Sequence, residues 1–177
     1  MIEFLWSNSN NLRQLQEEDL AIILQWRNDD KIRHFMFNSD VIALADHQAW
    51  FQRTVKDESK HLLIFEKNKF SVGFAQLSVL KGGVAEWGFY VDPSSPRGTG
   101  QQMALNVLQY SFESLNLHKI SARVIDFNQR SLHLHNKFFF TEEGVLRDEH
   151  YDGVKYHNVI CFGLLKNEWK NKVTSNA

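Results

Sequence analysis

The sequence has little cysteine, little proline and no long hydrophobic run. Its 177 residues include one cysteine, Cys161, so no disulfide can form within the chain, and a reducing compartment fits. No stretch approaches the roughly 18 consecutive apolar residues that suggest a membrane-spanning helix. The N-terminus also lacks the basic and apolar regions of a secretory signal. We therefore expect a cytoplasmic protein with no membrane partner.

An excess of charge of either sign is also missing. The chain has 20 basic and 21 acidic residues, a formal net charge of -1. No overall field would attract nucleic acid, so we expect no nucleic-acid partner and expect any anion to be held by local geometry. The histidines form no His-x-x-x-His pair and there is no cysteine cluster, so no metal site is expected.

The length and the 43% hydrophobic content fit one domain with a real core. We expect this domain over residues 11–170, with a flexible lead-in at 1–10 and a flexible tail at 171–177. Cys161 lies in an apolar run, Val159–Phe162, that predicts a buried strand. The sequence leaves a homodimer open.

Hydrophobic periodicity predicts strands that come first as hairpins and then alternate with helices. The expected strands are 11–16, His61–Glu66, Phe70–Leu80, Val84–Val91, Lys119–Asp126 and two strands joined at Asp152–Gly153, the second being Val154–Leu165. The expected helices are one that follows Glu17–Asp19 and runs to Asn28, then Asp46–Val55, Gln101–Leu115 and Asn128–Lys137. This pattern favours an α/β protein with a mixed, mostly antiparallel sheet.

The loop after the strand Val84–Val91 is the most informative segment. It contains both prolines of the chain, Pro93 and Pro96, and then Gly98 and Gly100 at the start of a predicted helix. Glycines let backbone N–H groups approach an anion, and the first turn of a helix has unpaired donors, so the loop suits a phosphate. A helix start that needs glycine only for its backbone angles is the alternative. The glycine spacing fits neither a P-loop nor a dinucleotide-binding loop.

This segment resembles the acetyl-CoA motif of GNAT acetyltransferases, Arg/Gln-x-x-Gly-x-Gly/Ala, with Arg97 and Gly100 in place and Gln102 where Gly or Ala is usual. A second stretch resembles the family signature Asn-x-x-Ser-x-x-Leu-Tyr/His-x-Lys-x-Gly-Phe. It matches at Asn128, Ser131, Leu134, His135, Lys137 and Phe140, with Phe139 replacing the glycine. The resemblance implies the GNAT fold, with helices on both faces of the sheet, and acetyl-CoA as cofactor. The implied cofactor-binding residues are Phe89, Tyr90, Val91, Arg97, Gly98, Thr99, Gly100, Gln101, Gln102, Asn128, Ser131 and Lys137.

Acetyl transfer to an amine needs a polarised thioester, a base for the amine and a proton for the thiolate. The resemblance implies that the Val84–Val91 strand diverges from its neighbour and that an N–H near Phe89 to Val91 polarises the thioester. His135 stands where many family members have a tyrosine, and it either protonates the thiolate or is structural. Glu86 and Asp126 are candidate bases, and either one has a solvated surface charge as its alternative.

Aromatic, methionine and amide side chains gather in the N-terminal third. The candidate substrate-binding residues are Trp26, Arg27, Asn28, Met36, Phe37 and Tyr90. Core packing is the alternative for the apolar ones. The stretch resembles the acetyltransferases of pseudaminic acid biosynthesis, which acetylate the 4-amino group of a UDP-linked amino-dideoxy sugar, so an amino sugar nucleotide is the expected small-molecule substrate. The alternatives are a polyamine or protein N-terminus as acceptor, and a non-catalytic acyl-CoA-binding domain.

Overall fold

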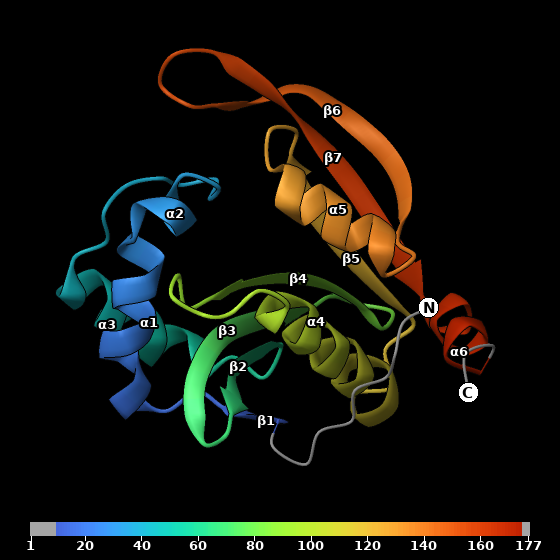
Figure 1. Ribbon diagram of the computed structural model, residues 1–177, viewed down its shortest axis with the longest axis horizontal. Coiled ribbons are helices and arrows are strands. Elements are labelled where there is room, and N and C mark those ends of the chain that lie inside the picture. Colours follow the sequence, from blue (N-terminus) through green and yellow to red (C-terminus); the bar gives the residue numbers. More distant parts are fainter. Residues whose placement is uncertain (1–9, 175–177) are drawn as a thin grey trace.

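The computed structural model describes residues 10–174, with side chains as far as residue 171. Figure 1 shows the path of the chain. The strands are β1 (Asn10–Gln14), β2 (Lys60–Lys67), β3 (Phe70–Val79), β4 (Val84–Val91), β5 (Lys119–Ile125), β6 (Thr141–Tyr151) and β7 (Tyr156–Leu165). The helices are α1 (Leu20–Asn28), α2 (Asp30–Arg33), α3 (Leu44–Thr54), α4 (Thr99–Gln109), α5 (Gln129–Lys137) and α6 (Lys166–Thr174).

All of these strands form one sheet in the order β1-β2-β3-β4-β5-β7-β6. Neighbouring strands are antiparallel except β4 and β5, which run parallel. The parallel pair arises because α4 carries the chain back across the sheet between β4 and β5, as a crossover connection must. The predicted mixed, mostly antiparallel sheet is confirmed.

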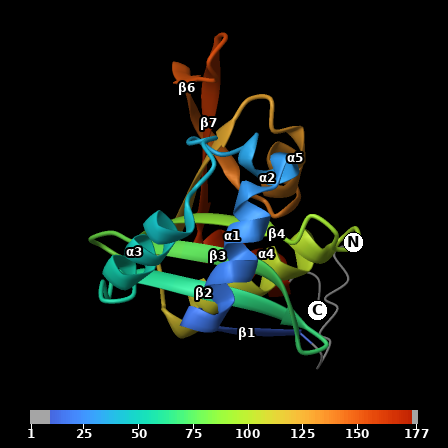
Figure 2. The ribbon, with the colours of Figure 1, turned by 90° about the vertical axis from the view of Figure 1, so that its left-hand side faces the viewer.

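The two faces of β2 pack against different helices. Leu62 and Ile64 belong to a core cluster with residues of α1 and α3, whereas Leu63 and Phe65 belong to a cluster with residues of α4. Because successive side chains of a strand point to opposite faces, the helices must cover both faces of the sheet. Figure 2 shows this arrangement, with α1 and α3 in front of the sheet and α4 behind it. Helices on both faces are therefore confirmed.

Several element bounds differ from the sequence prediction. The helix expected over Gln101–Leu115 begins at Thr99 and gives way to a π-helical turn at Tyr110–Ser114. The last strand begins at Tyr156 and not at Val154, because the Asp152 carboxylate accepts two backbone N–H bonds of 2.8 Å that keep residues 154 and 155 in the turn. The short helix α2 and the C-terminal helix α6 were not predicted.

The two chain ends and the cysteine also differ from the sequence prediction. The expected lead-in lies outside the described residues except for Asn10, which begins β1. The expected tail starts inside α6, which continues to Thr174, and residues 175–177 lie outside the described part. Cys161 is half-buried and not buried as expected. Its partner in β6 is Gly144, which has no side chain to cover it.

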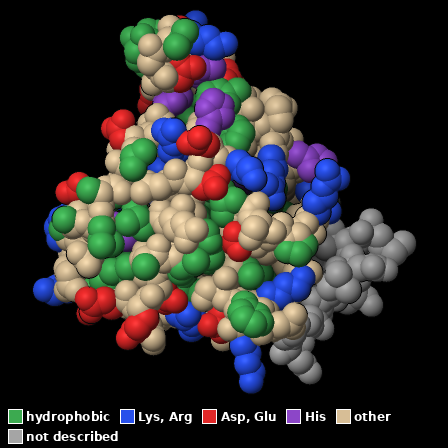
Figure 3. Space-filling view, turned by 60° about the vertical axis from the view of Figure 1, so that its left-hand side comes forward, with side chains coloured by type: hydrophobic (Ala, Val, Ile, Leu, Met, Phe, Trp, Pro, Cys, Tyr) green, Lys and Arg blue, Asp and Glu red, His purple; other side chains and the backbone are tan. Residues whose placement is uncertain are grey.

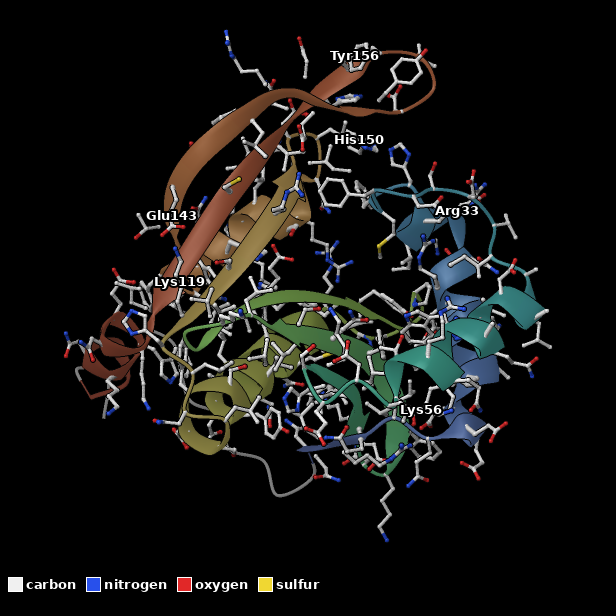
Figure 4. All side chains as sticks on the ribbon, turned by 180° about the vertical axis from the view of Figure 1, so that it is seen from behind. Arg33, Lys56, Lys119, Glu143, His150 and Tyr156 are labelled. Atoms are coloured by element: carbon white, nitrogen blue, oxygen red, sulfur yellow. The ribbon has the colours of Figure 1, made fainter. Side chains whose placement is uncertain are left out.

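The β6–β7 hairpin, residues 141–165, projects beyond the rest of the sheet, and we call it the arm (Figure 1). Lys119 of β5 anchors the base of the arm through an ion pair of 2.6 Å to Glu143, and Figure 4 shows both side chains there. The tip exposes Tyr151, Val154 and Tyr156. In Figure 3 the tip stands out from the surface and carries hydrophobic side chains.

Candidate active site

The main cleft opens where β4 and β5 separate. Their parallel pairing covers only Val84 to Glu86 on β4, opposite Lys119 to Ser121 on β5. Beyond that point the strands diverge around a cleft of about 430 Å³, lined by residues 86–91 of β4 and 121–125 of β5. Side chains of α5 and of the α2 region complete its walls. The predicted divergence of the Val84–Val91 strand is thus present.

The separation leaves backbone donors of β4 free. The N–H of Asp92 donates to a β3 carbonyl at 2.9 Å, and the carbonyl of Val84 accepts from the residue after β3 at 2.7 Å. In an antiparallel pair, the backbone N–H and C=O groups of alternate residues point to the partner strand. In β4 those of the even-numbered residues point to β3. The N–H groups of Phe89 and Val91 therefore point to the side that β5 has left. They could pair with an extended ligand as an added strand would.

The loop that follows β4 ends in the N-terminus of α4. Gly98 is the N-cap residue with φ +94°, a conformation that favours glycine, and Gly100 lies on the cleft wall. In the described part of the chain, the N–H groups of Gly98 and Gly100 have no acceptor within the protein. Thr99 is buried and its hydroxyl donates to the Pro96 carbonyl at 2.9 Å, which fixes the loop. Free donors at a helix start suit a phosphate.

The two glutamines of the first α4 turn point away from each other. Gln101 Oε1 accepts a 2.8 Å hydrogen bond from Lys137 of α5, and Gln102 Oε1 accepts one of 3.1 Å from Lys67 of β2. Arg97 is exposed beside them. The Gln102 side chain is directed toward the end of β2, which explains how a glutamine is tolerated where the family motif has a small residue.

Helix α5 presents the second motif to the cleft. Asn128 caps it by accepting the Ser131 N–H at 3.1 Å, and both residues line the cleft. Lys137, at the other end of the helix, meets α4 through Gln101. Phe139, which replaces the usual glycine, has φ +64°. A residue other than glycine costs about 1–2 kcal/mol in this conformation, which accounts for the glycine that the motif normally carries.

His135 is buried at the back of the cleft, with 3% of its surface exposed. Its Nδ1 lies 2.8 Å from the Ser131 carbonyl oxygen, and its Nε2 lies 3.2 Å from the indole nitrogen of Trp87. An indole N–H only donates and a carbonyl only accepts, so Nδ1 carries the proton and Nε2 accepts. Burial lowers the pKa of His135 to about 4. Both ring nitrogens are engaged and the ring is neutral, which favours the structural alternative for this residue.

This burial predicts a pH dependence of stability. In the unfolded chain His135 protonates near pH 6.5, whereas in the folded protein it stays neutral down to about pH 4. The unfolded state therefore binds the proton first, and the free energy of unfolding falls as pH drops through this window. The shift corresponds to about 3 kcal/mol. Burial also lowers the pKa of His47 and of His61, which adds in the same direction.

Urea denaturation at about pH 7 and about pH 4.5 tests this expectation. The wild type should lose stability at the lower pH, and His135→Phe should lose distinctly less. An equal pH dependence in the two proteins would contradict the burial of a neutral His135.

The two candidate bases differ in position. Glu86 lies on the cleft wall, exposed, with no hydrogen bond or ion pair to another described residue. Asp126 does not line the cleft, since one oxygen accepts the Asn158 N–H at 3.0 Å and the other lies 3.3 Å from His157 Nδ1. Glu86 shares its face of β4 with Tyr90, which packs toward α1. Of the two candidates, Glu86 lines the cleft and Asp126 does not.

Some of the predicted substrate-binding residues line the cleft and others do not. Met36, Phe37 and Tyr90 line the cleft. Trp26 does not, because it is 4% exposed and packs in the core between the sheet and α1. Asn28 holds the following loop by two hydrogen bonds of 2.9 Å to the backbone of Ile42, so its amide is structural.

Arg27 is not among the residues that line the cleft. Its Nη2 donates to the carbonyl of Asn38, while Nη1 is buried and has no partner. The Nε2 atom of His47, a residue 5% exposed, is also buried and unpaired. Burial and then the positive charge of Arg27 lower the pKa of His47. Buried polar atoms are normally paired, so these two are exceptions, and because both are buried an acceptor in the cleft does not reach them.

Sequence reasoning missed several residues of the cleft wall. They are Lys31, Ile32 and Phe35 near α2, Arg123 on β5 and Arg130 on α5. The four-residue helix α2 is too short to show a clear period, although the three-residue spacing of Ile32 and Phe35 was available as a signal. Arg123 was missed because only the pairing of β5 with β4 brings it to the cleft.

Aromatic contacts join α2 to the far half of the chain at one end of the cleft. The rings of His34 and Phe127 lie 5.1 Å apart, and those of Phe37 and His150 lie 5.8 Å apart. The guanidinium of Arg123 lies 5.3 Å above the Phe37 ring. Side chains from the N-terminal third and from the β5–β7 region therefore meet at this end of the cleft.

Comparison with known proteins identifies the fold and the chemistry. Residues 11–141 match the family of acetyltransferase (GNAT) domains. The chain is 27% identical to a prophage-derived uncharacterized N-acetyltransferase of Bacillus subtilis, over 93% of this chain and 95% of the relative. It is 25% identical to acetyltransferase PseH of Campylobacter jejuni, over 74% of this chain and 82% of that protein. It is 26% identical to the spermidine N(1)-acetyltransferase of Vibrio cholerae, over 91% and 95%.

A crystal structure of spermidine N-acetyltransferase from Vibrio cholerae, in complex with CoA and spermine, superposes with a TM-score of 0.86 at 24% identity. The superposition covers 93% of this chain and all of that one. No helix within residues 10–174 is long and apolar enough to cross a bilayer. The free β4 amides and the open helix start fit the extended arm and the diphosphate of CoA. The chain belongs to the GNAT family of acetyl-CoA-dependent N-acetyltransferases.

Proposed function

We propose that this cleft transfers the acetyl group of acetyl-CoA to the primary amine of a small molecule. The observation that carries the proposal is Glu86, an unpaired carboxylate on the cleft wall at the point where β4 and β5 separate. Acetyl-CoA supplies the activated thioester. Glu86 accepts the proton of the amine, directly or through water, as the C–N bond forms and the C–S bond breaks.

The remaining groups of the cleft hold the reacting atoms. The N–H groups of Phe89 and Val91 are placed to bind the cofactor arm and to stabilise the oxyanion that develops on the thioester carbonyl. His135 keeps Trp87 and the first turn of α5 in place through its two hydrogen bonds. Because both ring nitrogens of His135 are engaged within the protein, we assign the proton of the thiolate to solvent.

For the acceptor we propose an amino sugar nucleotide. The cleft wall carries more basic than acidic side chains: Lys31, Arg123 and Arg130, compared with the single carboxylate of Glu86. One of the three, Arg123, is paired with Glu149 at 2.7 Å. Groups of this kind suit the oxygens of an anionic acceptor such as a nucleoside diphosphate sugar. The similarity to PseH agrees with this acceptor.

A polyamine is the second candidate, and the comparisons support it at least as well. The spermidine acetyltransferases match over more of the chain than PseH does. The charge of the cleft opposes this choice, because a polyamine carries several positive charges at neutral pH and would meet few carboxylates. A protein N-terminus, a cytoplasmic location and a homodimer stay predictions.

An acceptor panel separates these candidates. The protein is incubated with acetyl-CoA and a UDP-linked amino-dideoxy sugar, spermidine, spermine or a peptide, and released thiol is measured. We expect the sugar nucleotide to give the highest kcat/KM. Preferential turnover of spermidine would replace the first acceptor by the second. Thermal stabilisation by acetyl-CoA without thiol release from any amine would contradict a catalytic role.

Lys31→Gln tests the anionic acceptor directly, because Lys31 lines the cleft, is exposed and has no ion pair in the described structure. We expect the KM for the sugar nucleotide to rise about tenfold, the loss typical of one charged hydrogen bond, with the KM for acetyl-CoA unchanged. Lys56→Gln, at an exposed position after α3, is the matched control and should have no effect. Equal KM values for Lys31→Gln and the wild type would exclude Lys31 from acceptor binding.

A further inference from the structure

Three basic side chains surround the first turn of α4 without a matching acid. Lys67 comes from the end of β2, Lys137 from the end of α5, and Arg97 from the loop itself. Among the described residues, none of the three has a carboxylate within 4.0 Å, whereas Lys119 and Arg123 elsewhere are paired. In a chain with a net charge of -1, this is a local concentration of unbalanced positive charge.

The two lysines are held by amides and not by acids. Lys67 Nζ donates to Gln102 Oε1 at 3.1 Å, and Lys137 Nζ donates to Gln101 Oε1 at 2.8 Å. A carboxylate in place of the amide would neutralise the ammonium, but a neutral amide oxygen fixes its position and leaves its charge and two N–H donors for a ligand. Adjacent residues of α4 thus place one cation on each side of the helix start.

CoA carries more negative charge than its diphosphate alone. A third phosphate sits on the 3′ position of its ribose, and the free N–H groups at Gly98 and Gly100 are already assigned to the diphosphate. An exposed phosphate of this kind is bound well by a lysine, which acts as a compact point charge.

We propose that Lys67, positioned by Gln102, binds the 3′-phosphate of CoA. This inference rests on the use of acetyl-CoA. It also assigns a role to Gln102, which stands where the family motif has a small residue. Gln102 is a positioning residue, because it acts through Lys67. Lys137, the last residue of α5, is held by Gln101 and contributes positive charge on the opposite side of the helix start.

The test compares CoA with 3′-dephospho-CoA by isothermal titration calorimetry. The wild type should bind CoA at least tenfold more tightly than dephospho-CoA, about the value of one charge-assisted contact. Lys67→Gln should bind CoA about tenfold more weakly and dephospho-CoA as the wild type does, so the preference disappears. Gln102→Ala should lose part of the same preference. Lys69→Gln, in the same hairpin without a hydrogen bond to α4 in the described structure, should keep it.

Three results would overturn the proposal: an unchanged CoA affinity in Lys67→Gln, an equal loss for both ligands, or a wild type without preference. The melting temperature of each variant without ligand should equal that of the wild type, which excludes misfolding as the cause. If the wild type binds neither ligand, the use of acetyl-CoA itself fails. If it binds CoA but turns over no amine, only the acceptor assignment fails.

Discussion

Glu86→Gln should lower kcat by about 100-fold, the lower end of what a general base contributes. The amide keeps the shape of the side chain and cannot take the proton of the attacking amine. The affinity for acetyl-CoA should stay near the wild-type value, because Glu86 lies on the face of β4 that meets α1 and not on the face that meets α4. Thiol release at saturating concentrations of both substrates measures the effect.

The pH profile distinguishes a lost base from a structural defect. Without Glu86 the enzyme depends on amine that is already deprotonated, so the rate of Glu86→Gln should keep rising as the pH approaches the pKa of the acceptor amine. Asp126→Asn is the comparison variant, because Asp126 lies outside the cleft and binds the backbone of β7. It should reduce stability and leave kcat within a few-fold of the wild type. A full rate for Glu86→Gln at neutral pH would remove Glu86 from the mechanism.

Gly100→Val should weaken acetyl-CoA binding by at least tenfold, about 1.4 kcal/mol, with little change in folding stability. A Cβ at Gly100 would meet only a methyl group of Val91, at 3.9 Å, so the protein itself can accept a side chain there. The branched methyls would instead occupy the cleft beside the free N–H groups of the loop, where the phosphate oxygens should lie. Calorimetry with acetyl-CoA and thermal unfolding without it measure the two quantities.

Gly144→Val is the matched control for this substitution. Gly144 lies on β6, away from the cleft, and a Cβ there has no atom within 4 Å. It should bind acetyl-CoA as the wild type does. If Gly100→Val also binds normally, the diphosphate does not sit at the start of α4, and the placement of the cofactor in this cleft must be abandoned.

Much of the fold was predictable because its signals are local. The strand Val84–Val91 was predicted at its observed bounds, and the start of the helix after Gly98 was predicted within two residues. The alternation of side chains along the Val84–Val91 strand also predicts that Glu86 and Tyr90 share one face. A period of two in a strand and glycines at a turn are properties of neighbouring residues, so they are visible in the sequence.

Roles in the site were less predictable, because a role depends on partners that are distant in the chain. His135, Asp126, Trp26 and Asn28 looked as suitable as Glu86, Met36 and Phe37 by residue type. Their hydrogen bonds and core contacts, made with β4, β7 and the loop before α3, occupy the groups that a substrate would need. Lys67 was not suspected at all, since it lies 35 residues before its partner Gln102.

The sequence by itself determined the order of elements, the glycine loop that opens α4 and the two motifs that indicate acetyl-CoA. These depend on backbone preferences and on residue types at short, fixed spacings. The tertiary structure alone decided where β4 and β5 separate and which side chains face the resulting cleft. A side chain can bind a ligand only if the fold leaves its donors and acceptors unpaired, and that outcome depends on the packing of the whole chain.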